Sequence, residues 1–477
     1  MRFTPPGRFR TLAELRGRLA EVAPSLRADD EVLGAAGPFG QPITVLGRKL
    51  SNRFACHPME GWDGMADGLP TDLTLRRWRR FGESGAALVW GGEAFAVQRD
   101  GRANANQLYR EPAADSLGGL VRLRAELLAG AASRGDAPGA QLIGLQLTHS
   151  GRFARPDGSP APRPAFTHPV LDRKYSLLAG APLLTDGELE GIGESFVAAA
   201  RMAQDAGFDF VDVKCCHGYL LHELLAARAR PGSYGGDLAG RARLLRRILA
   251  EIRSACPGLG LGVRLSLADT VPYEAGPDGI GRPMDCEIPY RHGFGVDPRR
   301  PDEPDFQEPM ELIALLRQEG VKLLNVTLGS PYWNPHLQRP AAYPPSDGYQ
   351  PPADPLTFVA RQVEAARLAK TAAPDLCVVS TGWTYLQEFI PHFAQHALGV
   401  GGTDFIGLGR MLLSYPDLPR DLLAGRVPDR RRLCRTFSDC TTAPRNGLVS
   451  GCYPLDDHYR ALPEAARVKA LRPESGA

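Results

Sequence analysis

The sequence has little net charge, few cysteines and no long apolar run. Its 56 Lys and Arg nearly balance its 54 Asp and Glu, so the composition indicates neither nucleic acid nor an anionic membrane as a partner. No 18-residue apolar stretch is present, and Met1–Leu26 has no apolar core of signal-peptide length. Nine cysteines in 477 residues do not form a dense secreted disulfide framework. We expect a cytoplasmic protein that acts on a small molecule, with homo-oligomerisation left open.

Internal repeats and low-complexity tracts are also missing. What the sequence has is a regular alternation of short apolar runs with helical patterns. The runs span residues 53–57, 86–92, 142–152, 208–213, 259–267, 323–328, 376–381 and 404–409. Because parallel strands need helical crossovers, eight such units between residues 50 and 425 predict a closed (β/α)₈ TIM barrel.

Three regions are expected along the chain. Residues 1–40 form an N-terminal extension with an amphipathic helix, residues 41–425 form the barrel, and residues 426–477 form an irregular C-terminal tail. Two Gly/Pro-rich segments, 269–309 and 329–354, are too long for ordinary connections. We expect both to be excursions that shape an active-site pocket.

The fourth run ends in three side chains that exchange protons or form hydrogen bonds. Lys214, His217 and Tyr219 follow FDFVDV within six residues. The carboxyl ends of barrel strands carry the chemistry in such folds, so these residues are candidate catalytic groups. The alternative is that His217 and Tyr219 are satisfied polar groups of the core.

Two glycine-containing strand ends point to an anion site. Run seven continues into Thr381-Gly382-Trp383, and run eight into Gly407-Leu408-Gly409-Arg410. Barrels often bind phosphate with the loops after strands seven and eight, although tight-turn packing would also use these glycines. Gln146 and Arg264 lie in apolar runs, and a buried arginine needs either a bound anion or a structural carboxylate partner.

Six motifs stand in order along residues 40–425, and together they resemble the old yellow enzyme family of FMN-dependent oxidoreductases. The motifs are NRFACHPM, GLQLTHSGR, CHGYLLHELL, RPGSYGG, GVRLS and FIGLGR. The resemblance implies an FMN across the barrel mouth, reduced by NAD(P)H and reoxidised by an activated alkene. The implied FMN-binding residues are Pro58, Met59 and Ala94 at the ring, Gln146 at the pyrimidine edge, Arg264 at N1/O2, and Gly382, Gly409 and Arg410 at the phosphate.

The resemblance also implies roles for the three residues after the fourth run. Lys214 and His217 would bind the substrate's carbonyl oxygen, and Tyr219 would give a proton to the neighbouring carbon. The chemistry requires this arrangement, because hydride addition to a conjugated alkene leaves an enolate that positioned donors must stabilise.

Two residues depart from the family pattern at the ring. Lys214 stands where ene-reductases carry histidine, and Glu60 stands where they carry cysteine or threonine. A carboxylate there would disfavour anionic reduced flavin unless a cation or proton neutralises it, so we expect Glu60 and Lys214 to be coupled. Two alternatives stay open: an amine or alicyclic dehydrogenase similar to trimethylamine dehydrogenase, and a flavin-binding barrel without turnover.

The tail resembles an incomplete iron–sulfur motif of the larger relatives, trimethylamine dehydrogenase and 2,4-dienoyl-CoA reductase. Cys434, Cys440 and Cys452 match three of the four cysteine spacings, and Phe437 stands at the fourth. A [4Fe–4S] cluster takes four thiolates, so we expect a tail without metal, with an alternatively ligated cluster left open. His217 and His222 lack the four-residue spacing of a zinc site. Since the sequence ends at Ala477, we expect no electron-relay domain after the tail.

Overall fold

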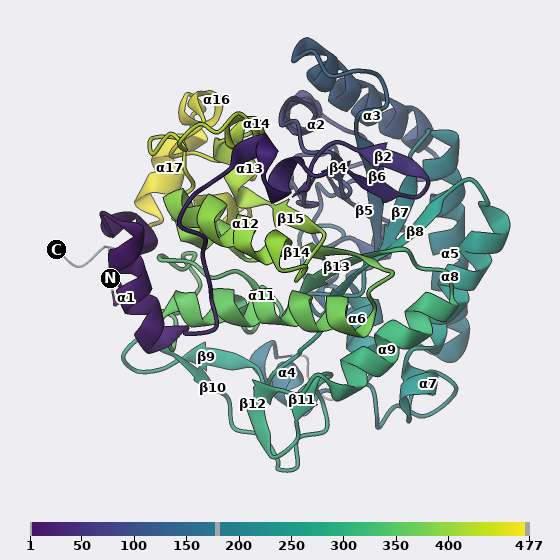
Figure 1. Ribbon diagram of the computed structural model, residues 1–477. Helices are drawn as coiled ribbons and strands as arrows, with labels where there is room; N and C mark the ends of the chain where they lie inside the picture. The colour runs from purple at the N-terminus through teal and green to yellow at the C-terminus, as the bar shows by residue number, and fades with distance from the viewer. Residues whose placement is uncertain (1, 177–181, 473–477) are drawn as a thin grey trace.

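A closed ring of parallel strands lies at the centre of the molecule (Figure 1). The computed structural model describes residues 2–176 and 182–472. The nine strands of the ring are β3 (Phe54–Cys56), β4 (Leu88–Val89), β5 (Ala94–Ala96), β6 (Leu142–Thr148), β7 (Phe210–Val213), β8 (Gly260–Ser266), β13 (Leu323–Thr327), β14 (Cys377–Ser380) and β15 (Phe405–Leu408). β4 and β5 both pair with β6 and share one barrel position, so the ring has eight positions. The predicted (β/α)₈ barrel is confirmed.

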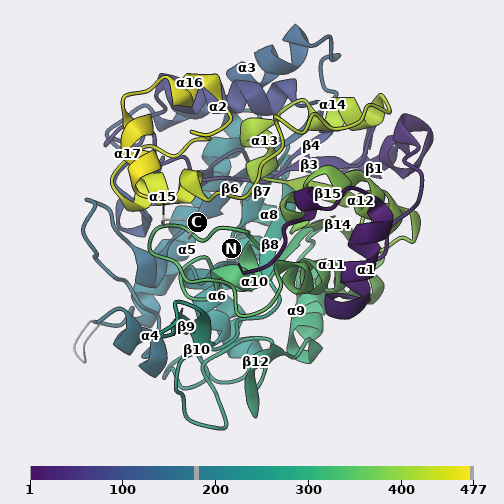
Figure 2. The same cartoon turned by 90° about the vertical axis from the view of Figure 1, so that its left-hand side faces the viewer.

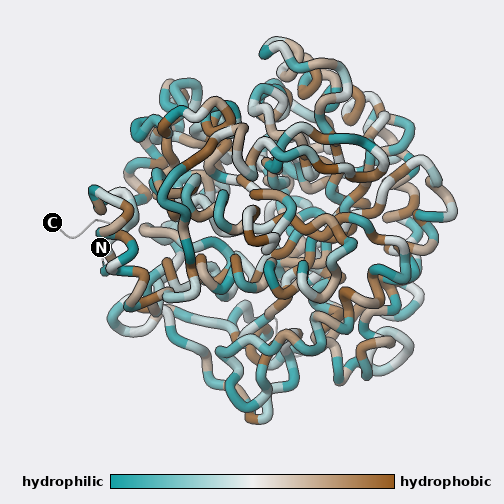
Figure 3. The backbone as a smooth tube through the Cα atoms, viewed as in Figure 1, coloured by the Kyte–Doolittle hydropathy of each residue, from teal (hydrophilic) through white to brown (hydrophobic). Residues whose placement is uncertain are grey.

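The helices of the outer layer follow the predicted order. They are α2 (Asp72–Glu83), α3 (Ser116–Ser133), α5 (Asp186–Asp205), α6 (Leu220–Leu225), α8 (Arg243–Ala255), α9 (Gln307–Gln318), α11 (Pro355–Ala372) and α12 (Ile390–Gly399). α5 begins with a capping box between Thr185 and Glu188, and its buried face repeats at helical spacing. Hydrophilic segments lie mainly along the outer helices and loops (Figure 3). None of the helices in the described ranges is long and apolar enough to cross a membrane.

Short elements fill the connections. They are η1 (Pro6–Arg8), η2 (Gly34–Ala36), η3 (Pro38–Gly40), η4 (Arg99–Gly101), η5 (Gly151–Phe153), α4 (Pro169–Lys174), α7 (Leu238–Arg241), α10 (Pro335–Gln338), η6 (Trp383–Phe389), α13 (Arg410–Ser414) and α14 (Leu418–Leu423). A hairpin of β1 (Ile43–Val45) and β2 (Arg48–Leu50) contributes Val45 and Leu50 to a cluster with the barrel residues Leu88, Phe210 and Phe405. That cluster lies at the end of the ring away from the strands' carboxyl termini.

The 269–309 segment is more regular than the sequence indicated. It holds two antiparallel hairpins, β9 (Tyr273–Ala275) with β10 (Gly281–Pro283), and β11 (Val296–Asp297) with β12 (Arg300–Pro304). Strands of two to five residues are too short to show an alternating pattern, which is why the sequence read as unpatterned.

Both ends of the chain pack on the barrel. α1 (Leu12–Val22) lies against α11, with an ion pair of 2.8 Å between Arg18 and Asp354. The tail contains α15 (Asp439–Arg445), α16 (Asp457–Arg460) and α17 (Glu464–Ala470), so the expectation of an irregular tail is corrected. Its helices share a small apolar core of Ala443, Tyr459 and Val468 that the sequence pattern did not reveal. Figure 2 shows the tail, in yellow, beside α2.

Candidate active site

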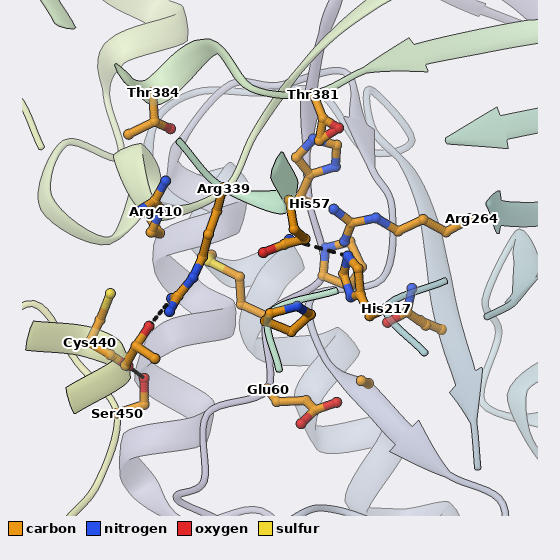
Figure 4. Close-up of a pocket in the computed structure, with 18 of the residues that line it drawn as sticks. His57, Glu60, His217, Arg264, Arg339, Thr381, Thr384, Arg410, Cys440 and Ser450 are labelled. Carbon is orange, nitrogen blue, oxygen red and sulfur yellow. Dashed lines mark hydrogen bonds between the residues drawn. The ribbon is translucent and has the colours of Figure 1, made fainter. Parts of the chain in front are cut away.

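A cavity of about 270 Å³ opens at the carboxyl ends of the barrel strands (Figure 4). All twelve residues that the sequence proposed for catalysis and cofactor binding line it. They are Pro58, Met59, Glu60, Ala94, Gln146, Lys214, His217, Tyr219, Arg264, Gly382, Gly409 and Arg410. The fold brings them together because each follows or occupies a strand of the parallel ring, and parallel strands end at one rim.

Strands β6, β7 and β8 form one end of the cavity. Gln146 faces Asp212 across the sheet, and its Nε2 donates to Asp212 Oδ2 at 2.6 Å. Asp212 also accepts from Trp90 Nε1 at 2.7 Å and from the backbone N–H of Arg264 at 2.6 Å. The Asp212 carboxylate is therefore occupied by neutral donors.

Arg264 keeps its guanidinium free of carboxylate partners. It forms no ion pair within the described ranges, and its Nε is buried without a hydrogen-bond partner. Burial lowers the pKa of Arg264, with Cys216 and Asp212 opposing that shift. Among the described residues no carboxylate is therefore in ion-pair contact with the Arg264 guanidinium, which lines the cavity.

Glu60 accepts hydrogen bonds from two other residues of the cavity wall, Lys214 and Tyr219. Lys214 Nζ lies 3.1 Å from Glu60 Oε1, which is the contact expected from the sequence. Tyr219 Oη donates to the same oxygen at 2.9 Å, and Lys214 Nζ lies 3.8 Å from the centre of the Tyr219 ring. One carboxylate thus holds both the ammonium and the phenol.

Tyr332, which the sequence did not single out, extends this network. Its hydroxyl lies 3.0 Å from the Tyr219 hydroxyl, and its ring stacks on Phe153 at 4.1 Å. Because the Tyr219 hydroxyl donates its hydrogen bond to Glu60, the Tyr332 hydroxyl must donate to the Tyr219 oxygen. Burial, then the charge of Glu60 and the nearby Tyr332, raise the pKa of Tyr219 well above its usual value, so the phenol stays protonated.

His217 occupies a strained turn between β7 and α6. Its φ is +65°, a conformation that costs free energy for a residue with a side chain. Two hydrogen bonds fix this backbone: the His217 N–H donates to Ser266 Oγ at 3.2 Å, and the His217 carbonyl accepts from Ser330 Oγ at 2.8 Å. Its Nε2 lies 3.2 Å from the side-chain amide nitrogen of Gln338. Burial, then Arg264 and Lys214, hold the pKa of His217 well below its usual value, so the imidazole is neutral.

Two arginines, Arg339 and Arg410, lie across the cavity from Arg264 (Figure 4), and Gly382 and Gly409 line the same cavity. Gly382 has a φ of +98°, which favours glycine. Arg410 donates through Nη2 to the Pro340 carbonyl at 3.1 Å, and Arg339 donates through Nη1 to Thr441 Oγ1. The cavity therefore has positive charge at both ends, which suits an elongated ligand that is negative at both ends.

The tail cysteines are free thiols placed near one another. The charges of Cys434 and Cys440 both contribute to the raised pKa of Cys452, after burial. Among the described residues no group of three or more His, Cys, Asp or Glu side chains is arranged to hold a metal ion. Phe437 packs on Tyr343 with ring centres 5.3 Å apart. His222 accepts from the Gly218 N–H at 2.9 Å and serves the turn.

Several cavity residues were missed by the sequence reasoning. Those from the 329–354 loop and the tail are Tyr332, Gln338, Arg339, Thr441 and Ser450, and His57 directly follows β3. His57 carried a usable signal, since it stands at a strand's carboxyl end. The loop and tail residues carried none, because no periodic pattern surrounds them.

Comparison with known proteins gives consistent matches. Residues 39–276 match the model of the NADH:flavin oxidoreductase / NADH oxidase family. An NADPH dehydrogenase of Halalkalibacterium halodurans is 31% identical over 384 residues, covering 79% of this chain and 91% of that protein. An NADPH dehydrogenase of Geobacillus thermodenitrificans is 27% identical, covering 79% and 91%.

Solved structures show the same fold at lower identity. A 2-naphthoyl-CoA reductase in complex with 2-naphthoyl-CoA has a TM-score of 0.64 at 18% identity, covering 90% of this chain and 58% of that one. An old yellow enzyme from Pichia has a TM-score of 0.57 at 22% identity, covering 85% and 92%.

Proposed function

The chain belongs to the NADH:flavin oxidoreductase / NADH oxidase family, and we propose that NAD(P)H reduces its bound FMN and that the hydride then passes to an activated alkene. The observation that carries the acceptor proposal is the gathering of Lys214, His217 and Tyr219 on one wall of the cavity. The nine cysteines are all free thiols, which supports a reducing, cytoplasmic location.

The residues present fit FMN. The Arg264 guanidinium, which forms no ion pair with a described carboxylate, and Gln146, which lines the same cavity, suit the pyrimidine edge, where reduced flavin carries negative charge. At the opposite end Gly382, Gly409 and Arg410 suit the phosphate, since Arg410 Nη1 is also buried and has no partner within the described ranges. When bound, FMN accepts hydride from NAD(P)H and delivers hydride to the acceptor.

In this proposal Lys214 and His217 bind the oxygen of a conjugated carbonyl. Lys214 uses one N–H on Glu60 and has two more to offer, and the neutral His217 has one ring N–H. Donors fixed before the reaction stabilise the negative charge that develops on that oxygen. An α,β-unsaturated ketone or aldehyde has the matching chemistry.

Tyr219 is the proposed proton donor to the carbon next to the one that takes hydride. The hydrogen-bond chain from Tyr332 through Tyr219 to Glu60 holds the phenol in place and protonated. Glu60 also balances the charge of Lys214, so its carboxylate need not oppose reduced flavin on its own. The two departures from the family pattern thus form one unit.

Anaerobic stopped-flow absorbance tests this function in two steps. We expect NADPH or NADH to bleach the flavin band, and 2-cyclohexenone to restore it. Bleaching by amines but not by NAD(P)H would instead indicate the amine dehydrogenase, which the NADPH dehydrogenase relatives do not favour. A flavin that NAD(P)H reduces but no enone reoxidises would overturn the acceptor proposal, and an unreactive flavin would indicate a non-catalytic barrel.

A further inference from the structure

Arg339 and Arg410 form a pair of guanidinium groups on one wall of the cavity. Figure 4 shows both side chains on the wall opposite Arg264. Arg410 Nη2 donates to the carbonyl of Pro340, the residue after Arg339, at 3.1 Å. Each arginine then has one buried nitrogen, Nη2 of Arg339 and Nη1 of Arg410, that finds no hydrogen-bond partner among the residues the structure describes.

Neither arginine has a counter-ion in the described part of the chain. Within residues 2–176 and 182–472 no carboxylate forms an ion pair with Arg339 or with Arg410, whereas neighbouring Arg445 pairs with Asp347. Burial, then the charges of Arg445 and Arg410, lower the pKa of Arg339 to about 9. Holding two like charges together away from water is unfavourable unless an anion joins them.

We propose that Arg339 and Arg410 bind one phosphate-type dianion between them, and that the C-terminal tail positions Arg339 for this through Thr441. Guanidinium forks suit a phosphate group, which offers several acceptor oxygens and two negative charges. Two sources share this chemistry: the 5′-phosphate of FMN, which rests on the proposed function, and a phosphate of the nicotinamide reductant. The geometry favours FMN, because Gly382 and Gly409 line the same cavity.

The tail is built into this wall. Arg339 Nη1 donates to Thr441 Oγ1, and the Ala342 N–H donates to Thr436 Oγ1 at 2.9 Å. Arg445, at the end of α15, donates through Nη2 to the Pro331 carbonyl at 3.0 Å. The tail therefore holds the Arg339 loop at both sides, and Thr441 acts on the site by positioning the Arg339 guanidinium.

Flavin binding to the Arg339→Met variant of the full chain tests the FMN source. We measure dissociation constants of FMN and of riboflavin, which lacks the phosphate, by flavin fluorescence quenching. Loss of a charge-assisted contact predicts FMN affinity about 10- to 100-fold weaker, with riboflavin affinity unchanged. Arg230→Met is the control, because Arg230 is buried but paired with Asp186 at 2.7 Å outside the cavity.

The holoenzyme tests the other source. Inorganic phosphate is titrated as an inhibitor of NADPH oxidation in the wild type and in Arg339→Met. If FMN affinity is unchanged while phosphate inhibition is lost and KM for NADPH rises, the site takes the reductant's phosphate. If FMN, riboflavin and phosphate all bind as in the wild type, the two-arginine site is wrong. Flavin affinity is read without turnover, so this failure is distinct from failure of the proposed oxidoreductase function.

Thr441→Val tests the positioning role of the tail. We expect a several-fold weaker FMN affinity with unchanged riboflavin affinity, because the guanidinium loses its fixed acceptor. Thr442→Val is the matched control, since Thr442 Oγ1 accepts from the Ser346 N–H at 3.2 Å and does not line the cavity. Equal FMN affinity in the two variants would show that the tail does not position Arg339.

Discussion

At the scale of single residues, Glu60 explains how a lysine and a tyrosine share one wall. Its carboxylate accepts from Lys214 at 3.1 Å and from Tyr219 at 2.9 Å, so each donor fixes the position of the other. A negative charge beside a buried phenol keeps that phenol protonated. The Tyr219 hydroxyl is therefore protonated, and able to donate its proton, throughout the pH range near neutrality.

Tyr219→Phe removes the proposed proton donor while leaving the ring that Lys214 covers. We expect reoxidation of the flavin by an enone to slow by about 10²- to 10⁴-fold, the usual contribution of general acid catalysis. Flavin reduction by NADPH should be unchanged, because no step of it uses this proton. Tyr332→Phe, which removes the neighbouring hydroxyl, should slow reoxidation less. Equal reoxidation rates in Tyr219→Phe and the wild type would rule out the proton-donor role.

Glu60→Gln tests the electrostatic part of the network through pH. A phenol must be protonated to donate, so reoxidation falls at pH values above its pKa. The pKa of Tyr219 is raised in the wild type by burial, Glu60 and Tyr332, so the rate should stay level to high pH. Without the carboxylate that pKa is lower, and the alkaline limb of the reoxidation rate should move to lower pH. A limb that stays in place or moves upward would contradict this account.

At the scale of elements, the turn between β7 and α6 aims His217 by close packing. Gly218 has a φ of +78°, and a Cβ there would come within 1.9 Å of the Trp333 ring. Gly218→Ala should therefore destabilise the fold by about 1–3 kcal/mol beyond the backbone strain. Gly236→Ala isolates that strain, because Gly236 has the same φ of +78° with nothing within 4 Å. Equal thermal midpoints for the two variants would show that the Trp333 contact does not matter.

Helix α2 is tied to the cavity rim by a buried triad. Arg77 pairs with Asp63 and Glu93, and Glu93 Oε1 accepts from the Gly61 N–H at 3.2 Å. Burial and the charge of Asp63 raise the pKa of Glu93 to about 7, against the opposing charge of Arg77. The folded state then binds more protons than the unfolded state between about pH 4.5 and 7, so stability falls as pH rises through that window.

Glu93→Gln should remove this contribution to the pH dependence. As the pH rises from 5 to 7.5, we expect the wild type to lose up to about 3 kcal/mol more unfolding free energy than the variant. Thermal midpoints at the two pH values measure the change. Glu126→Gln, partly exposed on α3, is the control and should keep the wild-type dependence. A Glu93→Gln variant that loses stability as steeply as the wild type would contradict the raised pKa.

The site residues on barrel strands could be predicted from the sequence, and those on the long loops could not. All eight barrel positions were predictable because buried parallel strands are short apolar runs, whereas β5, just after the 86–92 run, was not identified as a strand of its own. The twelve proposed residues lie in one cavity because they occupy or follow the barrel strands. Tyr332, Gln338 and Arg339 were not predictable, since the 329–354 loop has no periodicity and its path depends on contacts distant in sequence. The Tyr332–Tyr219 hydrogen bond, for example, spans 113 positions.

At the scale of the whole molecule, the tail completes the rim of the cavity. The Ser450 N–H donates to the Gly61 carbonyl at 3.1 Å, and Arg76 of α2 pairs with Asp456 at 2.9 Å. The cysteine spacing drew attention to this tail, but its helices and its docking depend on contacts that no local pattern encodes. Loop, tail and barrel together enclose a cavity with Arg264 at one end and Arg339 and Arg410 at the other, none of them in an ion pair with a described carboxylate.

The absorption spectrum of the anaerobically purified protein, titrated with NADPH, tests the central claim most directly. The account predicts flavin bands, stoichiometric FMN on extraction, and bleaching by NADPH that 2-cyclohexenone reverses. It also predicts that Arg264→Met loses both FMN and riboflavin affinity, because this guanidinium serves the ring and not the phosphate. A colourless protein that cannot be reconstituted with FMN would contradict the account.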